Sequence, residues 1–319
     1  MRTHAAITSV RSHSAKAIKV AHIMGRSRSQ RQSSQRRSSQ HQAQQQALSP
    51  HSVATSTGEV EVREDPFQPG AWEVLVNGVP SSHIHPDPLQ LEFEYMRWMA
   101  EMLAWFESTA VPEHQLRLTH LGGGACSLAR YCCARWPNAR NTVIELDEKL
   151  TQLVRQWFDL PRAPQLKIRA AEARESVEAF QPHSRDVIIR DVFLGNRTPE
   201  RCSSVEFMQA CARSLAPGGL YLANCGDHRD LHLAKSELRS MQEVFAHTAC
   251  IADPAMLKGR RYGNIVLIGS DRPLPQDTAL QQIQRNLLAG AVPAQYKDQR
   301  WTSDFSSAGS VLYDPADEA

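Results

Sequence analysis

The chain has 319 residues, 41% of them hydrophobic and 22% charged, which is enough for one large domain or two modest ones. Its charge is unevenly divided: residues 1–58 carry nine basic and no acidic side chains, whereas 59–319 carry 27 basic and 34 acidic ones. Residues 59–319 can bury a stable core without disulfides or metal. No apolar run approaches the roughly 18–20 residues that cross a bilayer, so we expect no membrane-spanning part.

The first 58 residues are rich in Ser, Arg and Gln, most densely between 27 and 46. Such a segment has too little apolar surface to offset the entropy lost on ordering, so we expect 1–58 to be a disordered basic tail. Three interpretations of this tail stay open: an inert or misassigned extension, an organelle transit peptide, and a basic arm that touches nucleic acid. The first is favoured, and nucleic acid is not expected as a partner.

Residues 59–111 are expected to form a small β-hairpin domain followed by a helix. Apolar and polar residues alternate there and lead to Asn77-Gly78, a dipeptide that favours positive φ and marks a tight hairpin turn. A helix is expected to start at Asp87-Pro88, because apolar residues then recur at helical spacing, at Tyr95, Met99, Met102 and Phe106.

Residues 112–275 alternate between strands and helices, which indicates a parallel sheet covered on both faces. We expect seven strands, at 116–121, 141–146, 165–170, 186–191, 220–224, 247–252 and 264–269. The clearest helix, 203–215, should end before Pro217-Gly218-Gly219, because proline and glycine cannot continue it. Residues 276–319 should add one helix and a polar tail.

Candidate ligand-binding residues lie where the first two strands of this region end. Gly122, Gly123 and Gly124 follow the first strand, and glycine lets the backbone bend sharply and approach a ligand at the start of the next helix. Glu145 ends the second strand, 23 residues after Gly122. A carboxylate at this spacing can accept hydrogen bonds from both hydroxyls of a ribose.

Two more acids follow the next two strands. Glu172 is placed to accept a hydrogen bond from an adenine amino group, and Asp191 ends the fourth strand. Since the carboxyl ends of parallel strands share one edge of the sheet, these residues together predict a nucleoside site. The dinucleotide fingerprint requires Gly or Ala where Ser127 stands, which favours an S-adenosyl-type ligand over NAD.

With these motifs, residues 60–275 resemble the spermidine synthase (polyamine aminopropyltransferase) family, particularly its spermidine synthase-like bacterial branch. The resemblance rests on the segments 74–79, 121–124, 143–147, 186–191, 215–219, 252–254 and 263–267. It implies an α/β fold: a class I methyltransferase-like Rossmann domain with a seven-stranded, mostly parallel sheet behind a small N-terminal β-hairpin domain. It also implies a homodimer.

The resemblance implies a transferase of polyamine biosynthesis. Its reaction moves an aminopropyl group from decarboxylated S-adenosylmethionine to a polyamine acceptor such as putrescine, leaves methylthioadenosine, and uses no metal. Asp191 would be the base, which the reaction needs because an alkylammonium with a pKa near ~10.4 has no free lone pair at pH 7. Glu145 would hold the ribose, Glu172 and Ala173 would face the adenine, and Leu146 would also contact the nucleoside.

Three positions depart from the pattern of the family. Leu194 stands where a second acid normally faces the diamine, Ala125 stands where an Asp pairs with the aminopropyl ammonium, and the usual Gln after the hairpin is absent. The missing charge could come from Glu92, Glu94 or Asp227. Two alternatives therefore stay open: an S-adenosylmethionine-dependent methyltransferase, and a non-catalytic nucleoside-binding homologue.

The cysteines and histidines point to no further chemistry. The seven cysteines form no C-x-x-C pair, which is typical of reduced thiols in a cytoplasmic protein. His83, His85 and Asp87 resemble metal ligands in spacing, but they lie in a proline-broken loop, so no metal site is expected. His120 is expected to be a buried histidine with satisfied hydrogen bonds.

Overall fold

The computed structural model describes residues 48–109, 115–195 and 197–315. The disorder expected for 1–58 falls mostly on residues 1–47, which lie outside this range. Folded structure begins before residue 58, because strand β1 (His51–Ala54) pairs antiparallel with β2 (Glu59–Glu64). The turn between them is closed by the amide of Thr55, which donates to the carbonyl of Gly58 at 2.7 Å. The polar composition of the tail concealed this short hairpin.

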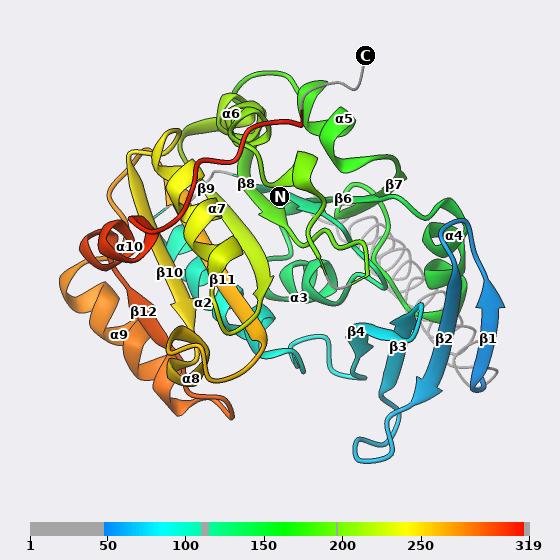
Figure 1. Cartoon of the computed structure of the whole chain (residues 1–319). Helices are drawn as coiled ribbons and strands as arrows, with labels where there is room; N and C mark the ends of the chain where they lie inside the picture. The colour runs from blue at the N-terminus through cyan, green and yellow to red at the C-terminus, as the bar shows by residue number, and fades with distance from the viewer. Residues whose placement is uncertain (1–47, 110–114, 196, 316–319) are drawn as a thin grey trace, which may run out of the picture. The chain divides into compact units, whose positions relative to one another are not determined.

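The N-terminal sheet is a four-stranded antiparallel meander in the order β1-β2-β3-β4 (Figure 1). Strands β3 (Trp72–Val76) and β4 (Val79–Ile84) form the expected hairpin. Its turn places Asn77 at φ 51° and Gly78 at φ 76°, as the Asn-Gly dipeptide predicts. On one face of the sheet the side chains of Val60, Val62 and Val74 are fully buried.

The large sheet has eight strands in the order β12-β10-β11-β9-β8-β5-β6-β7. All seven expected strands are present: β5 (Arg117–Leu121), β6 (Arg140–Glu145), β7 (Leu166–Ala170), β8 (Arg185–Arg190), β9 (Leu215–Asp227), β10 (His247–Ala252) and β11 (Gly263–Ser270). The eighth, β12 (Gln295–Lys297), pairs antiparallel with β10 at the edge of the sheet, in the region where only a helix and a polar tail were expected.

The strand order reverses at β5, which lies between β6 and β8 and is parallel to both. Parallel pairing runs from β7 to β9, whereas β10 and β11 are antiparallel to their neighbours. This topology confirms the class I methyltransferase-like Rossmann fold. Ligands of such sheets bind outside the carboxyl ends of the strands where the order reverses, here between β5 and β8.

Helices cover the large sheet on both faces (Figure 1). They are α2 (Glu94–Ser108), α3 (Ser127–Arg135), α4 (Glu148–Trp157), α5 (Ala173–Glu178), α6 (Val205–Ser214), α7 (His232–Gln242), α8 (Pro254–Leu257), α9 (Asp277–Ala289), α10 (Gln299–Ser306) and the short 3-10 helix η1 (Glu200–Cys202). Helices α6, α7 and α10 form one layer, and α2 packs on β9, β11 and α9 from the other. None of the helices in the described ranges has the length and apolar content needed to cross a bilayer.

The expected start of one helix was wrong. Helix α2 begins at Glu94 rather than at Asp87-Pro88, because the Asp87 carboxylate accepts from the Leu89 amide at 2.9 Å and closes a turn instead. Helix α6 ends at Ser214, before Pro217-Gly218-Gly219 as expected, but β9 begins directly at Leu215, so this segment lies within the strand.

Candidate active site

The glycine turn after β5 packs directly on the backbone of Asp191. Gly122 has φ 77°, and a Cβ on it would lie 2.1 Å from the carbonyl oxygen of Asp191. A Cβ on Gly123 would lie 2.2 Å from Cγ1 of Val143. Gly124 has φ 48°, and a Cβ there would approach Ser82 of β4 to 2.6 Å. Each glycine is therefore required by a close approach, and the turn packs against the end of β8.

Glu145, at the end of β6, holds this turn in place. One carboxylate oxygen, Oε2, accepts the amides of Gly123 and Gly124 at 2.9 Å each, and Oε1 accepts the amide of Asp147 at 3.0 Å. A carboxylate offers about four acceptor positions, so three backbone donors leave roughly one. For both ribose hydroxyls to donate to Glu145, at least one of these amides must break its hydrogen bond to the carboxylate.

Asp191 lies half-buried just beyond the end of β8, held by two donors. The hydroxyl of Tyr95 on α2 donates to Oδ2 at 2.8 Å, and Nδ2 of Asn224 on β9 donates to Oδ1 at 2.9 Å. Burial raises the pKa of Asp191 above its ordinary value, although these two hydrogen bonds and the nearby charge of Arg190 oppose that shift. An aspartate with a raised pKa in a fixed orientation suits a general base.

The residues expected to contact the nucleoside lie beside Glu145. Leu146 is 58% exposed and presents an apolar surface next to Glu145. The carbonyl of Glu145 accepts the amide of Ala171 at 3.0 Å, so the segment with Glu172 and Ala173 starts at the neighbouring strand end. Glu172 is partly exposed and caps α5 by accepting the amide of Glu175 at 2.8 Å, while Ala173 is buried.

The positions that depart from the family pattern carry no charge. Ala125 is fully buried, and its amide donates to Oγ of Ser82 at 2.9 Å, so β4 lies over the glycine turn. Leu194 is 75% exposed in the loop after Asp191. Asp227 caps α7, because its two oxygens accept the amides of His228 and Ala234, both at 2.7 Å.

Two residues of the site were missed by the sequence analysis. Tyr95 fits the apolar spacing of its helix, and nothing in the sequence around it indicates a use for its hydroxyl. Asn224 directly follows the apolar run of β9, and Ala223 pairs with Arg190. The register therefore places Asn224 beside Asp191. The available signal was a polar residue directly after a buried apolar run.

The histidines singled out by the sequence make protein contacts. Nε2 of His83 lies 2.9 Å from Oδ2 of Asp65, and Nδ1 of His85 accepts the amide of Asp87 at 3.0 Å. His120 lies 3.0 Å from Oδ1 of Asn141, and burial lowers its pKa to about 4, so it is neutral at pH 7. Within the described parts of the chain, no three His, Cys, Asp or Glu side chains gather as metal ligands.

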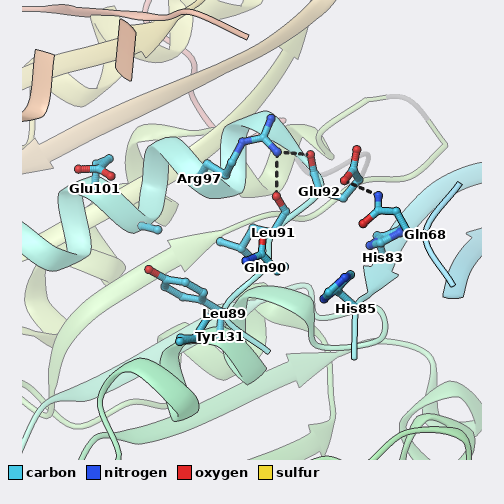
Figure 2. A pocket seen from close by; sticks show the side chains of 11 residues that line it. Gln68, His83, His85, Leu89, Gln90, Leu91, Glu92, Arg97, Glu101 and Tyr131 are labelled. Atoms are coloured by element: carbon cyan, nitrogen blue, oxygen red, sulfur yellow. Dashed lines mark hydrogen bonds between the residues drawn. The ribbon is translucent and has the colours of Figure 1, made fainter. Parts of the chain in front are cut away.

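Two hollows border α2 and share no lining residue. The one at Asp191 is small, about 20 Å³, and is lined by Gly122, Met96 and other mostly apolar residues. The larger one, about 270 Å³, is lined by Arg97 and Glu101 of α2, by Tyr131 of α3 and by the loop from His85 to Glu92 (Figure 2). Asp191 does not line the larger hollow, which is therefore separate from it.

The strand order and the helices on both faces define an α/β protein of class I methyltransferase topology. No family model matches the chain. The solved structure of a probable spermidine synthase from Corynebacterium glutamicum ATCC 13032 is 51% identical, covers 85% of this chain and 98% of its own, and superposes with a TM-score of 0.82. The chain therefore belongs to the spermidine synthase (polyamine aminopropyltransferase) family.

Other relatives are more distant. A curated polyamine aminopropyltransferase from Neisseria meningitidis serogroup A is 29% identical over 146 residues, which is 44% of this chain and 53% of the relative. The matched segment thus spans about half the length of that relative. The spermidine synthase structure from Thermotoga maritima shares the fold with a TM-score of 0.54 and 16% identity, over 81% of this chain and 83% of its own.

Proposed function

We propose that the protein is an aminopropyltransferase that uses decarboxylated S-adenosylmethionine and an amine acceptor. Putrescine, the acceptor that the family resemblance implies, is the first to test. The observation that carries the proposal is Asp191, fixed by Tyr95 and Asn224 at the point where the strand order reverses. The glycine turn and Glu145 lie beside it, in a chain that belongs to the family.

In the proposed reaction Asp191 accepts a proton from the acceptor's ammonium group. The freed lone pair on nitrogen attacks the propyl carbon bonded to the sulfonium sulfur. The carbon–sulfur bond breaks, its electron pair stays on sulfur, and methylthioadenosine leaves. The raised pKa of Asp191 makes its carboxylate a better proton acceptor, and the bonds from Tyr95 and Asn224 fix its orientation.

The nucleoside would bind across the ends of β6 and β7. Glu145 would accept from the ribose in exchange for a glycine amide, and the exposed side chain of Leu146 would contact the base. Glu172 and Ala173 would face the adenine from the start of α5. Calorimetry with decarboxylated S-adenosylmethionine, S-adenosylmethionine and methylthioadenosine tests this directly. Tighter binding of the carboxylated donor, or binding of methylthioadenosine with no turnover of any amine, would favour the methyltransferase or the non-catalytic alternative.

Glu145→Ala should weaken methylthioadenosine binding by about 1.5–3 kcal/mol, which is typical of hydrogen bonds to a charged group. Titration calorimetry measures the change. Glu148→Ala, an exposed acid on the neighbouring helix, is the matched control and should bind normally. Equal affinity of the Glu145 variant and the wild type would contradict a ribose contact at this carboxylate.

We also propose a cytoplasmic location and a homodimer. All seven cysteines are free and buried, which supports a reducing compartment. The homodimer rests on the family resemblance alone, and light scattering on the purified chain tests it.

A further inference from the structure

Residues 309–314, which follow α10, lie across helices α7 and α6, and we call them the C-terminal strap. Figure 1 shows the strap in red. On α7, the hydroxyl of Ser240 accepts the amide of Leu312 at 2.8 Å. At the start of α6, the amide of Val205 donates to the carbonyl of Leu312, also at 2.8 Å. The backbone of the strap is therefore fixed by hydrogen bonds to two helices.

At Asp314 the strap reaches Arg174 of α5, and the two side chains form a bidentate ion pair. Nη1 of Arg174 donates to Oδ1 at 2.9 Å, and Nη2 donates to Oδ2 at 2.7 Å. The hydroxyl of Ser204 also donates to Oδ1 at 2.6 Å, and the amide of Asp314 donates to Glu206 at 2.9 Å. Two parallel bonds between a guanidinium and a carboxylate fix the relative position of both groups.

Arg174 is 6% exposed, and charged side chains are rarely buried this deeply unless they are paired. Its Nη1 also donates to the carbonyl of Arg201 at 3.0 Å, and its Nε donates to Glu178. Arg201 lies in η1, in the segment between Asp191 and α6. Arg174 therefore connects α5 both to the C-terminal strap and to the segment that follows Asp191.

Arg174 also directly follows the two residues that would face the adenine. Glu172 caps α5, and Ala173 is the first residue of this helix. Helix α5 has six residues, and a helix this short depends on tertiary contacts to keep its place. Within the described ranges, the ion pair with Asp314 is the one that ties α5 to a segment far along the chain. The pair is thus placed to hold the adenine side of the site.

We propose that Asp314 is a positioning residue for the nucleoside: through Arg174 it holds the start of α5, with Glu172 and Ala173, at the edge of the sheet. This inference rests on the proposed binding of the nucleoside there. Asp314 acts through Arg174 rather than by touching the donor, and it takes no part in the proton transfer to Asp191. Loss of the pair should therefore weaken donor binding and leave the chemical step unchanged.

The first test is Asp314→Asn, which keeps the size of the side chain and removes the charge that compensates buried Arg174. The Kd of methylthioadenosine, measured by titration calorimetry, and the KM for decarboxylated S-adenosylmethionine should each rise about fivefold. The value of kcat at saturating donor, and its pH dependence, should match the wild type, because Asp191 keeps its partners. Asp304→Asn, an exposed acid on α10, is the matched control and should bind normally.

These measurements separate the inference from the proposed function. If the wild type binds methylthioadenosine and Asp314→Asn binds it equally well, the inference is overturned and the proposed function stands. If the wild type binds no methylthioadenosine, the proposed function fails and the inference fails with it. A lower kcat in Asp314→Asn with unchanged Kd would also overturn the positioning role.

Two further variants distinguish positioning from a general loss of stability, and all are measured well below their melting temperatures. Asp314→Glu restores the carboxylate and should recover the affinity to within about twofold of the wild type. In an Arg174→Met background, adding Asp314→Asn should change the Kd by less than about twofold, because the residue through which Asp314 acts is already gone. Equal affinities of the Asn and Glu variants, or a full fivefold loss in the Arg174→Met background, would overturn the inference.

Discussion

Asp191→Asn should lower the rate of transfer by about 10²–10⁴-fold, the usual contribution of a general base, while methylthioadenosine affinity stays within a few-fold. Asparagine has the size of aspartate and can still exchange hydrogen bonds with Tyr95 and Asn224, but it cannot accept the proton. Single-turnover release of methylthioadenosine and titration calorimetry separate the two effects. Asp271→Asn, an exposed acid, is the control and should retain full activity. Unchanged turnover in the Asp191 variant would remove this residue as the base.

The pH dependence of the wild-type enzyme follows from the same carboxylate. Burial raises the pKa of Asp191, and only the ionised form accepts a proton, so the rate should fall as the pH drops through a pKa above the ordinary aspartate range. The residual activity of Asp191→Asn should lack this inflection. A pH–rate profile with the same acid limb in both proteins would assign the limb to another group.

The raised pKa of Asp191 also affects stability. A carboxyl group whose pKa is higher in the folded than in the unfolded protein contributes stability below its unfolded pKa. That contribution is lost as the pH rises through the folded value. At neutral pH the ionised side chain therefore lowers the free energy of unfolding. The same ionised form is the one that can act as the base. Asp191→Asn should unfold at a temperature equal to or above that of the wild type at pH 7.

The buried parallel strands could be predicted from the sequence, whereas the edge strands β1 and β12 could not. Strand β8 carries Val187, Ile188 and Ile189, all essentially inaccessible, and such continuous apolar runs are typical of strands covered on both faces. Strands β1 and β12 join their sheets through backbone hydrogen bonds with one neighbour each. Strand β12 buries only Tyr296 of its three residues. It therefore shows no alternation of apolar and polar residues from which a strand could be predicted.

Candidate site residues could be predicted from the sequence where a glycine or an acid directly follows a predicted strand. The glycine turn, Glu145 and Asp191 are such residues, and in the structure the turn contacts both Glu145 and Asp191. Tyr95 did not stand out because a tyrosine that buries its ring reads as a core residue whether or not its hydroxyl is used. Arg190 could not be interpreted either, because its partner Glu237 lies 47 residues away on another element and no local spacing connects them.

Glu237→Leu should lower the free energy of unfolding by about 3–5 kcal/mol, because it leaves Arg190 as an unpaired buried charge. Both side chains have no solvent exposure. Arg190 donates through Nη2 to Glu237 on α7 and through Nη1 to Oγ1 of Thr198 at 2.7 Å. Arg190→Met should have a cost of the same size. Chemical denaturation measures each change.

The double variant Arg190→Met/Glu237→Leu distinguishes a lost pair from lost packing. With both charges removed, neither is left without a partner. The double variant should therefore lose clearly less unfolding free energy than the sum of the losses in the two single variants. Arg239 and Glu243, an exposed pair 3.5 Å apart at the C-terminal end of α7, are the control, and removing either should cost below about 0.5 kcal/mol. Strict additivity at Arg190 and Glu237 would show that the pair has no coupling.

Arg190 also connects this stability experiment to catalysis. Its charge lowers the pKa of the adjacent Asp191, against the larger effect of burial. Removing it should therefore raise the pKa of Asp191 further and move the acid limb of the pH–rate profile to higher pH. The stable double variant should show this shift even though its fold is intact. If the acid limb of the pH–rate profile does not shift, Arg190 contributes to the stability of the fold alone. Burial and the hydrogen bonds from Tyr95 and Asn224 would then determine the pKa of Asp191.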